Sequence, residues 1–97
     1  MTPSHLRFRT RAAPPLEWRT WGSESVAFDP ASGDTHTFDA VSRAGLACLD
    51  EQPSDAAELA SAMARRLDVA ADAALELYAA RLLARLDDLG VIEAIDA

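Results

Sequence analysis

Residues 26–39 constrain the fold of this chain more than any other stretch. They read V-A-F-D-P-A-S-G-D-T-H-T-F-D. Side chains alternate in character before and after residues 30–33, which is the pattern of two half-buried strands. Proline fixes φ and glycine accepts a positive φ, so P-A-S-G predicts a tight hairpin turn. Asp39 stands where a helix N-cap is expected. The segment therefore predicts a β-hairpin that leads directly into a helix.

Helical patterns dominate the rest of the chain. A first helix is predicted over about residues 40–50, a second after Asp55 and a third over about residues 72–89. Asp55 and Glu58 have capping-box spacing, Asp72 is a plausible N-cap and Gly90 a C-terminal stop.

Short strands are predicted at both ends of the chain. Residues 6–9 and 17–21 are candidate strands, and residues 91–95 form a short strand or an extended tail. The predicted fold class is α+β and winged-helix-like: a small antiparallel sheet of three strands, or four if residues 6–9 join it, followed by three helices.

The chain length of 97 residues is enough for one domain with a modest core. We divide it into an N-terminal arm, residues 1–15, either a strand or flexible, and a winged-helix domain, residues 16–97. No apolar run approaches the ~18 residues that a membrane span needs. The N-terminus has no hydrophobic stretch typical of a secretory signal. We therefore expect a cytoplasmic protein that does not bind a membrane.

Charge is distributed unevenly along the chain. The nine basic residues are all arginine, against sixteen acidic residues, for a net charge of −7. Residues 1–21 hold four arginines and one glutamate, +3, so the remaining five arginines and fifteen acids give −10. Phosphate backbones repel such a surface, and the hairpin has no basic residue between 22 and 42. A DNA-binding winged-helix regulator is therefore the least favoured hypothesis, and we expect no nucleic-acid partner.

Residues with catalytic or metal-binding chemistry are sparse. His36 has only His5 and Cys48 as soft partners, and no H-x-x-x-H or C-x-x-C spacing occurs. We interpret His36 as structural and Cys48 as a small buried core residue. Asp87 and Asp88 are adjacent on a helix, so they point in different directions. We predict no catalytic residue, no metal and no cofactor, and hence no enzyme.

The third predicted helix carries an apolar arc of about 140°, which is wider than one contact stripe needs. Its members are Leu75, Tyr78, Ala79, Leu82, Leu83, Leu86 and Leu89. Either the whole arc is core, or one edge of it forms the wall of a peptide-binding groove.

Three motifs together resemble the PqqD-like family of peptide-binding domains, also called RiPP precursor recognition elements. They are W-x-x-x-x-V-x-F-D-P-x-S-G-D-T-H-x-F-D at residues 21–39, P-x-x-x-x-E-L-A at 53–60, and L-x-x-L-x-x-L-G-V-I-E at 83–93. The resemblance covers roughly residues 16–94. The segment S-G-D-T-H, residues 32–36, is most similar to the subfamily that accompanies HPr-kinase-related proteins.

The resemblance implies a non-catalytic adaptor that captures the leader of a precursor peptide and presents it to a peptide-modifying or HPr-kinase-related enzyme. The leader would add as a strand beside the third strand of the sheet and reach a cleft against the third helix. The corresponding strand edge is formed by Asp34, Thr35, His36, Thr37 and Phe38. The facing wall is drawn from Leu75, Tyr78, Ala79 and Leu82. Tyr78 is the preferred anchor, and its alternative is an ordinary tyrosine at the rim of the core.

Two further possibilities concern partners. Residues 1–15 could cover the open strand edge or pair two chains, so the protein is expected to be a monomer or a homodimer. Arg7, Arg9 and Arg11 could contact an acidic partner. The alternative function is an interaction subunit that docks on a partner enzyme without binding peptide.

Overall fold

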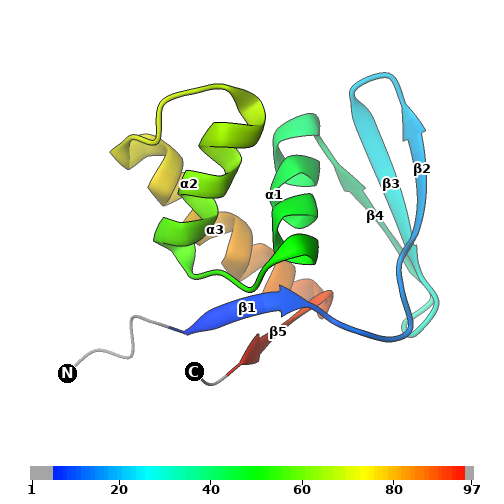
Figure 1. Cartoon of the computed structure of the whole chain (residues 1–97). Coiled ribbons are helices and arrows are strands. Elements are labelled where there is room, and N and C mark those ends of the chain that lie inside the picture. The colour runs from blue at the N-terminus through cyan, green and yellow to red at the C-terminus, as the bar shows by residue number, and fades with distance from the viewer. Residues whose placement is uncertain (1–5, 96–97) are drawn as a thin grey trace.

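The computed structural model describes residues 6–95 and has an α+β architecture (Figure 1). The strands are β1 (Arg7–Thr10), β2 (Glu17–Trp21), β3 (Glu24–Asp29), β4 (Asp34–Phe38) and β5 (Ile92–Ile95). The helices are α1 (Ala40–Glu51), α2 (Ala56–Leu67) and α3 (Ala73–Leu89). The predicted fold class is confirmed, since a three-stranded antiparallel sheet precedes three helices. None of the helices in residues 6–95 is long and apolar enough to span a membrane.

The sheet has the strand order β2-β3-β4, which leaves β2 and β4 at its edges. The predicted turn between β3 and β4 is present: Gly33 has φ +80°, and its N–H donates to the Asp29 carbonyl at 2.7 Å. A positive φ of this size favours glycine, so the turn is specified locally by its own residues. The hairpin leads straight into α1, with Asp39 between them.

The inward face of β3 is made of small or polar residues. Ser25, Ala27 and Asp29 are buried, whereas Phe28 is 40% exposed on the opposite face. Trp18 pairs with Ala27 from one side and Phe38 pairs with Ser25 from the other. The two rings approach to 5.7 Å between centroids. Large side chains from the flanking strands therefore occupy the space above β3, so its own inward residues must be small.

The strand β1 forms a second, two-stranded sheet with β5 instead of joining the first. Phe8 pairs with Ala94 and Arg9 with Glu93. On its other side, Phe8 exchanges two main-chain hydrogen bonds of 2.9 Å with Ser54. The expectation that this segment adds a fourth strand to the main sheet is therefore wrong, because both of its edges find partners elsewhere. Figure 1 shows β1 and β5 running across the ends of the helices, away from β4.

The helix ends follow the predicted caps. The side chains of Asp39, Asp55 and Asp72 each accept a hydrogen bond from the third helical residue, at 2.7 to 2.9 Å. Asp55 and Glu58 form the predicted capping box. Gly90 ends α3 with φ +75°. Each signal depends only on residues within one turn, which is why the helices could be located from the sequence.

The core lies between the three helices and the inner face of the sheet. Its largest members are Phe38, Leu46, Leu49, Leu59, Met63 and Leu86. Cys48 is buried among them, as predicted, and its burial raises the pKa of the thiol. At Gly45 the helices approach so closely that a Cβ atom would lie 2.5 Å from Cδ2 of Leu82.

A buried ion pair connects the two sheets. Arg11 donates to both carboxylate oxygens of Asp29, and also to the main-chain oxygens of Gly90 and Pro14. Asp29 is fully buried, and the hydrogen bond from Arg11 lowers its pKa to about 2. Arg11 thus binds the end of β3 to the segment that joins α3 to β5.

Candidate functional site

The outer edge of β4 is open. Within residues 6–95, β3 is the only strand that pairs with β4. An edge strand presents main-chain donors and acceptors that another extended segment can pair with. Thr35 and Thr37 are exposed, His36 is half-buried and Phe38 is buried in the core. Arg85 of α3 reaches this strand, and its Nη2 donates to the Thr37 carbonyl at 3.0 Å.

A pocket of about 210 Å³ lies where the end of β4 meets α1 and α3. Its lining residues are Asp39, Ser42, Tyr78, Arg81, Leu82 and Arg85. We call it the Tyr78 pocket. Asp39 directly follows β4, and Arg85 contacts that strand, so the pocket lies next to the open edge. An extended segment paired with β4 could therefore place a side chain in it.

Hydrogen bonds fix the tyrosine in this pocket. The hydroxyls of Tyr78 and Ser42 lie 2.8 Å apart, and Ser42 is buried. The N–H of Ser42 donates to Asp39 Oδ1 at 2.7 Å. That bond, with the nearby positive charge of Arg85, lowers the pKa of Asp39. The Asp39 carboxylate is consequently ionised and already used by the helix cap.

The four residues proposed for the α3 wall occupy different environments. Tyr78 and Leu82 line the Tyr78 pocket. Leu82 is also 4% exposed and belongs to the core. Ala79 is fully buried in the core, and Leu75 is half-buried against it, and neither lines the pocket. The broad apolar arc of α3 therefore serves mainly as core, and only one edge of it reaches the pocket.

Four lining residues were absent from the predicted site: Asp39, Ser42, Arg81 and Arg85. Arg81 lies three residues after Tyr78, and Arg85 lies four residues after Arg81 and three after Leu82. Residues with this spacing share a helix face, so this signal was present in the sequence. Ser42 and Asp39 could be added only once α1 was placed against α3.

Arginines gather around this region without carboxylate partners. Arg85 lies over the Phe38 ring, with its guanidinium carbon 5.0 Å from the centroid, and Arg43 lies 3.9 Å from the centroid of Trp18. In the described part of the chain, Arg43, Arg81 and Arg85 take part in no ion pair. His36 Nε2 and Arg43 Nη1 are buried without a hydrogen-bond partner among residues 6–95. Both side chains adjoin the Trp18–Phe38 ring pair.

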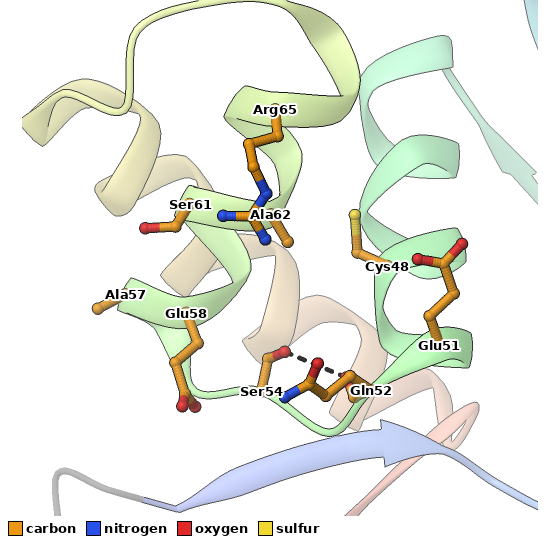
Figure 2. Close-up of a pocket in the computed structure, with 9 residues that line it drawn as sticks. All are labelled: Cys48, Glu51, Gln52, Ser54, Ala57, Glu58, Ser61, Ala62 and Arg65. Atoms are coloured by element: carbon orange, nitrogen blue, oxygen red, sulfur yellow. Dashed lines mark hydrogen bonds between the residues drawn. The ribbon is translucent and has the colours of Figure 1, made fainter.

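A larger hollow of about 390 Å³ lies between α1 and α2 (Figure 2). Figure 2 shows Cys48 and Glu51 on α1, with Glu58 and Arg65 on α2. Glu51 pairs with Arg66, and Glu58 pairs with Arg7. Because burial raises the pKa of Cys48, its sulfur is a neutral thiol and a poor nucleophile. This hollow therefore presents paired carboxylates and an unreactive thiol.

The side chains near the Tyr78 pocket offer an aromatic ring, an apolar surface and cationic donors, which are groups suited to binding a peptide. Nowhere in residues 6–95 do three His, Cys, Asp or Glu side chains lie in an arrangement that could hold a metal ion. Comparison of the chain with protein-family models, curated proteins and solved structures found no match.

Proposed function

We propose that this protein is a non-catalytic adaptor that binds an extended peptide segment by strand addition to β4. The single observation that carries the proposal is the position of the open β4 edge beside the Tyr78 pocket. In strand addition the main chain supplies affinity, and alternate side chains supply specificity through pockets. A strand edge without a pocket would bind extended peptides of any sequence. A pocket without a strand edge would not require the peptide to be extended.

The geometry suits a short ligand. The five residues of β4 can pair with a peptide segment of similar length. Successive side chains of a strand point to opposite faces, so every second side chain of the ligand would face α3. Tyr78 is the proposed anchor, because its ring borders the pocket while its hydroxyl remains bonded to Ser42.

The resemblance to PqqD-like domains supports the choice of ligand. The motif S-G-D-T-H spans the β3–β4 turn and the first residues of β4. Gly33 supplies the positive φ, and Ser32 Oγ accepts a hydrogen bond from the Asp34 N–H at 3.2 Å. The motif thus builds the hairpin that presents the β4 edge. On this basis the ligand is the leader of a precursor peptide, which the domain presents to a peptide-modifying or HPr-kinase-related enzyme.

Amide NMR tests the proposal. Labelled protein would be titrated with synthetic peptides encoded by short reading frames beside its gene. We expect saturable shifts confined to β4 and to the stretch of α3 that holds Tyr78 and Arg85. Replacing alternate ligand residues by proline, which cannot donate to a strand ladder, should abolish binding. Shifts confined to other surfaces, or no shift with any peptide, would refute the proposal.

The variant Tyr78→Ala should weaken binding, with Leu77→Ala as its matched control. Leu77 lies on the same helix but is 53% exposed, outside the Tyr78 pocket. Equal binding by both variants would exclude Tyr78 as the anchor. Leu82→Ala is unsuitable as a second probe, although Leu82 also lines the pocket. Leu82 is buried against α1, so its truncation would cost about 2–5 kcal/mol of folding free energy.

One observation favours the alternative that the chain docks on a partner enzyme. The outer face of the three-stranded sheet carries Trp21, which is 61% exposed, together with Phe28. Val26 and Phe28 also border a hollow of about 310 Å³ on this face. Exposed aromatic residues are typical of protein interfaces. If the outer sheet face binds an enzyme and the β4 edge binds peptide, the double variant Trp21→Ser and Phe28→Ser should no longer bind the enzyme. It should still show the amide shifts that peptide induces in β4.

A further inference from the structure

We infer that the ligand carries an acidic side chain, which Arg81 and Arg85 recognise at the rim of the Tyr78 pocket. This inference rests on the proposed function and specifies its ligand: an extended peptide with an aspartate or glutamate placed to reach α3. Three features of the described residues lead to this inference. Arg81 and Arg85 form no ion pair, both line the Tyr78 pocket, and Arg85 donates a hydrogen bond to a main-chain carbonyl of β4.

The charge balance offers every arginine a possible carboxylate partner, yet five of the nine arginines form no ion pair within residues 6–95. With sixteen acidic residues against nine basic ones, carboxylates are in excess. Four arginines, placed elsewhere, form ion pairs: Arg7, Arg9, Arg11 and Arg66. The arginines that form none within residues 6–95 are Arg19, Arg43, Arg65, Arg81 and Arg85. Of these five, Arg81 and Arg85 are the two that lie one turn apart and line the same pocket, and Arg85 stays unpaired although Asp88 lies three residues from it on the same helix.

Their position directs both cations toward the proposed ligand. Arg81 and Arg85 are one turn apart on α3, and both line the Tyr78 pocket. Asp39 is the one acidic residue among the lining residues, and the cap of α1 already uses its carboxylate. A ligand carboxylate placed here would meet two guanidinium groups, which bind carboxylates through charge-assisted and often bidentate hydrogen bonds.

The partner of Arg85 links this recognition to strand addition. Arg85 donates to the Thr37 carbonyl and lies over the Phe38 ring. An added strand needs main-chain acceptors of β4, including carbonyls on its open edge. A ligand carboxylate offers Arg85 a stronger acceptor than a neutral carbonyl. Moving the guanidinium onto that carboxylate would release the Thr37 carbonyl for the N–H of the ligand.

The test selects ligands from random sequences, so the natural client peptide need not be identified first. A phage library of random 12-residue peptides would be selected on wild-type protein and on the double variant Arg81→Gln, Arg85→Gln. Arg65→Gln is the matched control, because Arg65 also forms no ion pair in the described region but lines the hollow between α1 and α2. Thermal denaturation establishes that each variant is folded. We expect wild-type protein and Arg65→Gln to select peptides that share an Asp or Glu.

A selected peptide and its Asp→Asn or Glu→Gln analogue would then be compared. On wild-type protein the amide analogue should bind about tenfold more weakly or worse. On the double variant the two peptides should bind equally, because the cations that distinguish them are gone. Binding of the acidic peptide to wild-type protein should also weaken as salt is raised.

The outcomes separate this inference from the proposed function. Selected peptides that shift β4 amides but show no acidic preference would overturn the inference and leave peptide binding intact. An acidic preference that persists in the double variant would also overturn it. If no peptide is selected, or if the selected peptides shift only residues away from β4, the proposed function fails and the inference fails with it.

Discussion

Two groups of arginines in this protein hold different kinds of partner. The first group, called the β1 arginines, comprises Arg7 and Arg9 of β1 and Arg11 directly after it, and each of them pairs with a carboxylate of the same chain. A second group forms no ion pair in the described residues and lies on α1 or α3, where it contacts aromatic rings, a main-chain carbonyl or solvent. It consists of Arg43, Arg81 and Arg85, called here the unpaired arginines. The first group holds segments of the fold together, whereas Arg81 and Arg85 of the second group leave their charge available beside the β4 edge.

This comparison shows how far the net charge of a segment predicts its binding partners. The excess of positive charge in residues 1–21 suggested that the β1 arginines contact an acidic partner. In the structure their acidic partners are Glu58, Glu93 and Asp29. Opposite charges on two segments predict attraction between them, but the attraction can be satisfied within one molecule.

Arg11→Gln should produce the largest loss of stability. It leaves the buried carboxylate of Asp29 without its cation, which is costly in an interior. We expect the Tm to fall by on the order of 10 °C in thermal denaturation followed by circular dichroism. Arg9→Gln is the matched control, because its pair with Glu93 is about half-exposed and should change the Tm only slightly. A similar Tm for both variants would contradict the expectation that the buried Arg11–Asp29 pair contributes more to stability than the exposed Arg9–Glu93 pair.

The β1 arginines should also make stability depend on acid pH. Hydrogen bonds from Arg11 and Arg7 lower the pKa of Asp29 and of Glu58 to about 2, from ordinary values of 3.8 and 4.5. As the pH falls, these two carboxylates therefore take up protons at a higher pH in the unfolded chain than in the folded one. The stabilisation is complete above about pH 4.5 and disappears progressively toward pH 2. Urea unfolding at several pH values measures this slope.

Arg7→Gln should make that slope shallower, because Glu58 then loses the main cause of its lowered pKa. The matched variant Arg81→Gln should leave the slope unchanged, since Arg81 has no carboxylate partner among residues 6–95. A shallower slope in both variants would show that the effect reflects net charge and not the specific pair.

Tyr78→Phe tests the polar support of the pocket. The variant keeps the ring but leaves the buried Ser42 hydroxyl without the tyrosine partner. We expect a loss of about 1–3 kcal/mol in the free energy of unfolding measured with urea. Peptide binding should survive better than in Tyr78→Ala, because the ring surface remains. Unchanged stability would indicate that Ser42 does not depend on this bond.

Arg81→Gln and Arg85→Gln should have the smallest effect on folding. Both residues are exposed and neither forms an ion pair in the described residues, so Arg81→Gln should stay within about 0.5 kcal/mol. Arg85→Gln also removes a hydrogen bond to the Thr37 carbonyl and a contact with the Phe38 ring, so it should stay within about 1 kcal/mol. Urea unfolding measures this directly. A loss comparable to that of Arg11→Gln would show that the unpaired arginines are structural after all, and would abolish the contrast between the two groups.

Much of the local structure followed from the sequence. The β3–β4 hairpin, the three helices and their caps depend on residues within a few positions of one another, such as Gly33 in its turn and Asp55 with Glu58. The α+β class followed from their order. Of the proposed site, the strand β4 could be anticipated because hairpin chemistry is a local signal. The choice of Tyr78 came from the resemblance to PqqD-like domains, since helical spacing alone left it open whether this residue belongs to the core or to a groove.

Only the tertiary structure decided which partners distant segments take. It placed β1 against β5, turned Ser25, Ala27 and Asp29 of β3 inward, and set Ser42 beside Tyr78. Alternation along a strand shows that two faces differ but does not say which one is covered; that depends on the large residues that neighbouring strands supply. Contacts between residues far apart in the chain depend on the packing of the whole core, which no short stretch of sequence specifies.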